Sequence, residues 1–116
     1  MTQPVPNGVE LIPRPEKSPA ALKAALAVVA VDRLPEMIDG QTRAMAEAIE
    51  AGSVQPLRSF VDHWAAVVEI ERVPETAQAF HRANYLANHA DTAAECRQHA
   101  IQVAELYRAA YAAVTG

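Results

Sequence analysis

Cys96 and His99 are the residues whose types and spacing come nearest to a chemical site in this 116-residue chain. Positions i and i+3 share one face of a helix, so the thiol and the imidazole would be neighbours, with Glu95 beside them. A zinc site needs three or four such ligands, and a cysteine nucleophile needs a base and an orienting third group. The sequence supplies neither, and Cys96 falls in an apolar stripe where a buried thiol is inert. We interpret it as a structural thiol.

Carboxylates and glycines give no stronger pattern. Glu69 and Glu71 are two positions apart, so they point about 200° apart on a helix and cannot share a proton. The Glu-x-x-His spacing of di-iron bundles does not occur, and the four glycines are isolated, which excludes a glycine-rich phosphate loop. We therefore expect no enzyme activity, no catalytic, cofactor-binding or metal-ligating residue, and no cofactor.

The elements that would position these side chains are helices. The clearest helix covers residues 53–71 and carries the only tryptophan, Trp64, near its centre. Its apolar side chains recur at the 3,4 spacing that forms one stripe of an α-helix. They are Leu57, Phe60, Val61, Trp64, Val67 and Val68. This pattern predicts that Trp64 is the buried centre of a small helical core.

Start and stop signals predict the other helices. They cover residues 20–29, 32–51, 74–88 and 92–114. Ser18 is an N-cap before a proline, and Gly52 is a C-terminal stop. Gly40 should weaken or bend the second helix. Thr92 and Glu95 form a capping box that opens the last helix.

Length and composition agree with a helical fold. The chain has the length of one domain, and its hydrophobic share of 51% contrasts with an aromatic share of only 5%, which favours close helix packing over a β-sandwich. Four prolines lie among the first 17 residues and oppose regular structure there. We predict an all-α fold: a compact bundle of four or five helices over residues 18–116, preceded by a flexible proline-rich N-terminal arm over residues 1–17.

Two segments are candidates for binding a protein partner. In the arm, Val9, Leu11 and Ile12 could pack on the fold or dock on a partner as a strand. The last helix has a stripe formed by Cys96, Ala100, Val103, Tyr107, Ala110 and Val114. Leu106 and Tyr111 widen this stripe to more than half of the helix circumference. That helix is either central in the bundle or shares its second face with another copy, and we expect a homodimer through it.

Charge and cysteine content narrow the function classes. The formal net charge is −4 and no two basic residues are adjacent, which does not favour nucleic acid as a partner. One cysteine cannot form an internal disulfide. The start of the chain lacks the pattern of a signal peptide, and the longest apolar run, residues 24–31, is too short to span a membrane. We expect a cytoplasmic location and no membrane partner.

A DNA-binding regulator is the alternative function. Gly52 joins two predicted helices by a tight turn, as in a helix-turn-helix pair. The second helix, however, presents little to a DNA groove near its start beyond Gln55, Arg58 and Ser59.

The span Ala20–Arg72 also carries a resemblance. The matching residues are Leu34, Ala46–Ala51, Pro56, Leu57, Phe60 and Trp64. With these residues the span resembles a family of small bacterial helical proteins of unknown function, often encoded beside RelE-type toxins. The resemblance implies an antitoxin-like or toxin-associated role, while Glu75–Val114 departs from the shorter family pattern. We therefore predict a non-catalytic cytoplasmic protein-interaction module.

Overall fold

The structure is a computed structural model that describes residues 9–116, and every regular element in this part of the chain is a helix. The elements are α1 (Pro19–Val29), the 3-10 turn η2 (Val31–Arg33), α2 (Leu34–Ala51), α3 (Gln55–Glu71), α4 (Pro74–Asn88) and α5 (Ala93–Thr115). The prediction of an all-α fold with four or five helices is confirmed. No helix of the described residues has the length and apolar character needed to cross a membrane.

Several helices begin and end at the predicted caps. The Ser18 hydroxyl accepts a hydrogen bond from the backbone N–H of Ala21 at 3.2 Å. Thr92 accepts from the N–H of Glu95 at 3.1 Å and donates to the Glu95 carboxylate at 3.2 Å. Gly52 ends α2 with a φ of 62°, a conformation that favours glycine. These contacts satisfy backbone groups that a helix end leaves unpaired.

The middle of α2 differs from the prediction. The helix is uninterrupted at Gly40, where α3 packs against it. A Cβ atom at this position would lie 3.5 Å from the Phe60 ring and 3.8 Å from the indole nitrogen of Trp64. These are ordinary contact distances, so α3 lies close to α2 at Gly40 and still leaves room for a methyl group.

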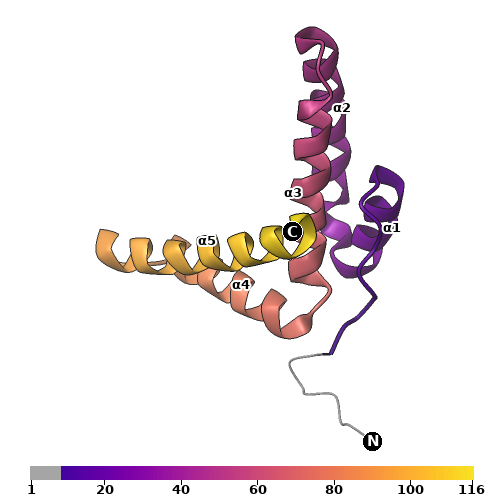
Figure 1. Ribbon diagram of the computed structural model, residues 1–116. Coiled ribbons are helices and arrows are strands. Elements are labelled where there is room, and N and C mark those ends of the chain that lie inside the picture. Colours follow the sequence, from indigo (N-terminus) through magenta and orange to yellow (C-terminus); the bar gives the residue numbers. More distant parts are fainter. Residues whose placement is uncertain (1–8) are drawn as a thin grey trace, which may run out of the picture.

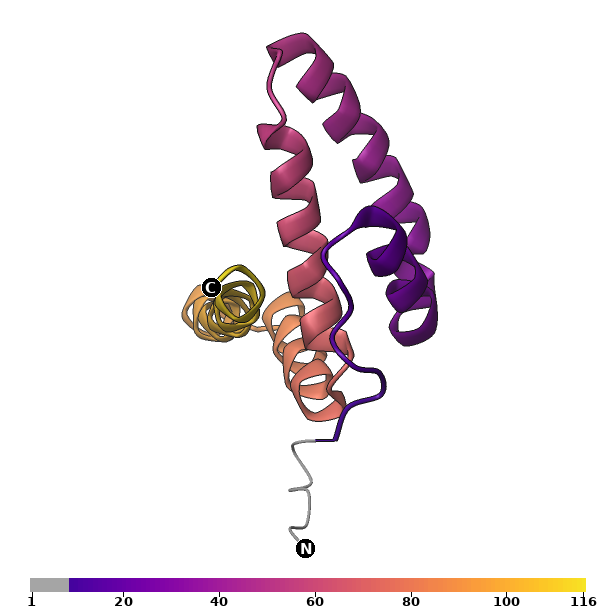
Figure 2. The ribbon, with the colours of Figure 1, turned by 45° about the vertical axis from the view of Figure 1, so that its right-hand side comes forward.

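The helices form a compact bundle around α3, from which the ends of two antiparallel hairpins extend (Figure 1). In this view the α2–α3 hairpin stands upright and the α4–α5 hairpin projects to one side, with α5 crossing α3. α1 lies along the lower part of the upright hairpin in both ribbon views (Figure 2). The outer end of each hairpin is consequently only two helices thick.

Trp64 lies in the centre of the core, with 3% of its surface exposed. The main buried cluster consists of Leu22, Ala25, Leu26, Met37, Ala44, Phe60, Trp64, Ala65, Val67 and Val68. A smaller cluster of Ala66, Ile70 and Ala110 joins α3 to α5. The prediction that Trp64 is buried among its stripe neighbours is confirmed.

The segment before α1 is held against the end of α3. The backbone N–H of Leu11 donates to the carbonyl of Arg72 at 2.8 Å, and the Arg72 guanidinium donates to the carbonyl of Ile12 at 3.2 Å. Arg14 forms a two-point ion pair with Glu69, with both hydrogen bonds at 2.9 Å. Charged groups on α3 thus anchor this segment.

This anchoring changes the description of the arm. The sequence predicts flexibility over residues 1–17, but residues 9–17 are fixed along α3 because they supply partners for its buried or half-buried charges. The rest of the predicted arm, residues 1–8, lies outside the described residues.

α5 packs through the C-terminal part of the predicted stripe, where Ala110 is buried and Val103, Tyr107 and Val114 are partly buried. Cys96 and Ala100 are exposed, whereas His99 and Leu106 are partly buried. The prediction of a buried structural thiol at Cys96 is wrong. The reason is that the first turns of α5 lie far from α3, at the outer end of the α4–α5 hairpin (Figure 1).

Candidate functional site

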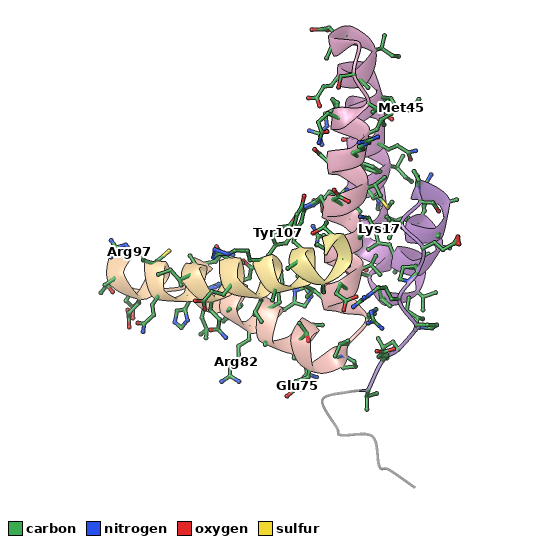
Figure 3. The ribbon with its side chains drawn as sticks, in the orientation of Figure 1. Lys17, Met45, Glu75, Arg82, Arg97 and Tyr107 are labelled. Carbon is green, nitrogen blue, oxygen red and sulfur yellow. The ribbon has the colours of Figure 1, made fainter. Side chains whose placement is uncertain are left out.

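A pocket of about 320 Å³ lies in the corner where the two hairpins meet, and we call it the corner pocket. Its lining residues come from η2, α3, α4 and α5 and are Arg33, His63, Val67, Ile70, Glu71, Phe80, His81, Asn84 and Tyr107. Tyr107 lies near the crossing of α5 and α3 (Figure 3). Apolar walls with a few polar groups, in a volume of this size, are typical of small-molecule sites.

Glu71 is a buried carboxylate on the wall of the corner pocket. Its side chain is 6% exposed and accepts hydrogen bonds from Nε2 of His81 at 2.8 and 3.1 Å. The His81 side chain is 55% exposed. The short connection at Val73-Pro74 turns the chain from α3 into α4 and brings the two residues together. An ionisable pair with one buried and one exposed member therefore borders the pocket.

His63 and Tyr107 join α3 to α5 on another part of the same pocket. The His63 Nδ1 atom and the Tyr107 hydroxyl share a hydrogen bond of 2.7 Å. Burial, and then the charge of Arg33, lower the pKa of His63, while burial raises the pKa of Tyr107. Both groups are thus uncharged near neutral pH. Arg33 itself forms a two-point ion pair with Glu36 at 3.1 and 3.2 Å.

The polar groups of the corner pocket include a carboxylate–imidazole pair. Glu71 orients His81 as a carboxylate orients a general base. The described residues that line the pocket, however, include no serine, threonine or cysteine for such a base to activate. The polar groups of the pocket are a carboxylate, a guanidinium, two imidazoles, an amide and a phenol, beside apolar walls.

A second feature is an apolar stripe on the outer side of α2, formed by Ile38, Met45 and Ile49. These side chains are 47%, 49% and 80% exposed. They are seven and four residues apart, which places them on one line along the helix. Met45 lies on the upright hairpin above α1 (Figure 3). We call these three residues the α2 stripe.

A groove of about 630 Å³ runs beside the α2 stripe, between α2, α3 and the start of α1. Its apolar lining includes Val54, directly before α3, and Leu57, Phe60 and Val61 of α3. An ion pair of 2.7 Å between Lys17 and Asp62 also lines it. We call this the α2–α3 groove.

The arm residues proposed for partner binding lie beside the end of α3. Val9 and Leu11 are 49% and 57% exposed. Ile12 is partly buried and packs against the main core. Ile12 therefore packs on the fold, whereas Val9 and Leu11 expose apolar surface that a partner could contact.

The residues proposed on the last helix have different surroundings. Leu106 is partly buried, and Tyr111 is 37% exposed with its ring centre 6.0 Å from that of Tyr107. The side of α5 that faces away from the bundle carries Ile101 with the charged Arg97 and Arg108 around it. The structure thus places the five predicted partner-binding residues on two separate elements.

Sequence reasoning missed both the corner pocket and the α2 stripe. One indication of the pocket was available: Glu71 continues the 3,4 spacing of Trp64 and Val68, so a charged residue occupies an apolar position of the helix. For α2, the apolar positions fall on two lines, of which Met37 and Ala44 are buried in the core. The second line is the α2 stripe.

The geometry of α2 and α3 does not favour the DNA-binding alternative. The helices of a helix-turn-helix pair meet at about 90–120°. α2 and α3 instead run antiparallel, side by side (Figures 1 and 2). In the described part of the chain, residues 64–68 of α3 are buried, so only its first turns are free to reach a partner.

Comparison of the chain with family models, curated proteins and solved structures found no match to any of them. Within residues 9–116, no group of three or more His, Cys, Asp or Glu side chains is arranged to hold a metal ion. The functional argument therefore depends on the residues and their geometry.

Proposed function

We propose that this chain is a non-catalytic, cytoplasmic protein-interaction module, antitoxin-like or toxin-associated in its role. Its partner is a basic protein that lays an amphipathic helix in the α2–α3 groove. The observation that carries this proposal is the α2 stripe. Three large apolar side chains are exposed along α2, and one of them, Met45, lines an apolar groove on a hairpin that is only two helices thick at this end. Exposed apolar surface of this kind is typical of an interaction site.

The charge of α2 indicates the kind of partner. The helix contains four acidic residues and one basic residue, a net charge of −3. Asp39 and Glu50 each follow a member of the α2 stripe, so carboxylates flank the apolar surface on its outer side. Basic residues on the partner would complement them along α2, while Arg58 and the Lys17–Asp62 ion pair line the groove itself. A second copy of α2 would instead bring acidic residues together, which argues against self-pairing through this helix.

The dimensions of the stripe fit a helix. From Ile38 to Ile49 it is 11 residues long, about 16 Å or three helical turns. Helix-in-groove complexes use apolar anchors at i, i+3 or i+4, and i+7 over a similar length. Val54, Leu57 and Val61 would contact these anchors from the α3 side of the groove.

The resemblance to proteins encoded beside RelE-type toxins supports a toxin as the partner. It covers Ala20–Arg72, the part of the chain that contains α1, α2 and α3. These helices build the α2–α3 groove, whereas α4 and α5 lie outside the resemblance.

The test is co-expression with each RelE-type toxin encoded in the same genome, followed by purification and calorimetric titration. We expect a complex whose affinity falls about tenfold or more in Met45→Glu and Ile49→Glu, because each places a charge in an apolar contact. Ile101→Glu is the matched control, since this residue is 52% exposed on α5 and should leave the affinity unchanged.

Three results would contradict parts of this proposal. Absence of any complex with these toxins would remove the toxin-associated role. An affinity insensitive to both α2 variants would remove the groove and direct attention to Val9 and Leu11. Tight, strongly salt-dependent binding of duplex DNA by the chain alone would favour the DNA-binding alternative.

A further inference from the structure

Glu71 carries a charge that the described part of the chain balances only in part. Its carboxylate is 94% buried, and within residues 9–116 its ion-pair partner is His81. A histidine is a weaker counter-ion than a guanidinium or an ammonium group, because it is charged only when it is protonated. A buried carboxylate without a full cation is costly, which makes Glu71 a strong acceptor for a cation that reaches the corner pocket.

Arg33 also lines the corner pocket and carries a permanent positive charge, but it is paired with other groups. Its guanidinium makes the two-point ion pair with Glu36 and lies 5.1 Å from the centre of the Trp64 ring. His63 shares its hydrogen bond with Tyr107. The interior of the pocket thus offers an available carboxylate and no competing permanent cation besides Arg33.

The walls of the corner pocket fit an alkyl chain that ends in a cation. Val67 and Ile70 of α3 and Phe80 of α4 supply apolar surface beside the carboxylate. The Phe80 ring lies next to His81, with ring centres 5.8 Å apart in an edge-to-face arrangement. An aromatic ring that lines the same pocket as a carboxylate is a favourable setting for an organic cation.

We propose that the corner pocket binds a guanidinium or primary ammonium group carried on a short alkyl chain. The Glu71 carboxylate accepts hydrogen bonds from the cation, and Val67, Ile70 and Phe80 contact the alkyl chain. His81 competes for the same carboxylate, and its exposed position allows the imidazole to turn away as the cation enters.

This chemistry is shared by free amines or guanidines and by the lysine or arginine side chains of a partner protein. The site does not depend on the proposed function, because the corner pocket and the α2–α3 groove lie on different sides of α3. Val61 lines the groove and His63, two residues on, lines the pocket.

A purely structural role for the Glu71–His81 pair makes a different prediction. If the pair only fixes α4 on α3, replacing either residue lowers stability and no cation binds. If the carboxylate is a binding group, removal of His81 frees it and strengthens cation binding. His81→Ala therefore separates the two roles.

The test is titration of the full chain with n-butylguanidinium and, separately, with N-acetyl-arginine methylamide, followed by NMR of the backbone amides and by calorimetry. The neutral analogue n-butylurea is the ligand control. We expect saturable shifts around the corner pocket with the cations, and affinity about tenfold lower in Glu71→Gln, since a charge-assisted hydrogen bond is lost. His81→Ala should bind about two- to fivefold more tightly.

Glu75→Gln is the matched control, because Glu75 is an exposed carboxylate of α4 outside the corner pocket (Figure 3) and should leave affinity unchanged. Binding of N-acetyl-arginine methylamide alone assigns the pocket to a partner's side chain, and binding of n-butylguanidinium alone assigns it to a small molecule. The proposal is overturned if neither ligand binds the wild type or His81→Ala. Equal affinity in Glu71→Gln also overturns it, and His81→Ala decides the matter if Glu71→Gln fails to fold.

Discussion

Trp64 shows how much of the fold depends on single side chains. Its ring is 3% exposed and is packed by Phe60 and by the backbone at Gly40. We expect Trp64→Ala to lower the free energy of unfolding by about 3–5 kcal/mol, measured by urea denaturation. Ile49→Ala, at a site that is 80% exposed, should change it by less than about 0.5 kcal/mol. Equal urea midpoints for the two variants would contradict the assignment of Trp64 to the core.

Glu69 links residue chemistry to the pH dependence of stability. Burial raises the pKa of Glu69, but hydrogen bonds and charges from Arg14 and Arg72 outweigh burial and lower it from 4.5 to about 2. Because the pKa is lower in the folded state, this carboxylate stabilises the fold above about pH 4.5, and its contribution is lost as the pH falls toward 2.

We therefore predict how Glu69→Gln changes acid denaturation. The wild type should exceed this variant in stability by a constant amount above about pH 5, and the difference should shrink between pH 4.5 and 2. Chemical denaturation at several pH values measures it, with the exposed Glu47→Gln as the control. A difference that persists unchanged to pH 2 would show that the three charges do not act together.

Among the elements, helix ends could be predicted from the sequence and side-chain pairing between helices could not. Ser18, Thr92 and Gly52 mark their helix ends through contacts within a few residues, so local sequence was sufficient. The two pairs of the corner pocket lie 10 and 44 residues apart in the sequence. They depend on how the hairpins are placed, which local patterns do not encode.

The packed face of α5 illustrates the same point. Its apolar residues cover so much of the circumference that periodicity alone cannot decide which line faces the bundle. In the structure the packed side of α5 includes His99 and Leu106 together with Val103 and Ala110 of the predicted stripe, and Cys96 is exposed. The α2 stripe could not be predicted for a related reason. The sequence pattern alone does not show which of the two apolar lines of α2 is buried and which is exposed.

We expect alanine substitutions at Gly40, within α2, and at Gly52, at its C-terminal end, to change stability in opposite directions. Gly40→Ala should raise the free energy of unfolding by about 0.5–1 kcal/mol, because alanine favours the helix and the new Cβ would lie at an ordinary contact distance of 3.5 Å from Phe60. Gly52→Ala should lower it by about 1–2 kcal/mol, because a φ of 62° is strained for alanine even with open space around it. Thermal unfolding of both variants is the measurement, and a shift of the same sign in both would contradict this assignment.

For the whole molecule, α3 is the element on which both candidate sites depend. One side of it borders the α2–α3 groove and another borders the corner pocket. The connection at Val73-Pro74 sets the direction in which the α4–α5 hairpin leaves α3, and hence the geometry of the corner. A partner bound in the groove and a cation bound in the corner would therefore contact the same helix from two sides.

Self-association is the remaining prediction for the whole molecule. The sequence predicts a homodimer through α5, and the structure leaves Tyr111 37% exposed there, while Leu106 is partly buried. Tyr111→Glu is thus the cleaner probe, because Leu106→Glu would also disturb the packing of a partly buried side chain.

We expect light scattering at micromolar concentrations to give about twice the chain mass of 12.5 kDa, and Tyr111→Glu to return the mass to that of one chain with its helicity intact. Ile49→Glu should leave the dimer unchanged, because acidic residues flank the α2 stripe and oppose its pairing with a second copy. A dimer lost in Ile49→Glu and kept in Tyr111→Glu would move the self-contact to the α2 stripe. A mass of 12.5 kDa at every concentration would exclude the dimer and leave Tyr111 to the packing of the α4–α5 hairpin alone.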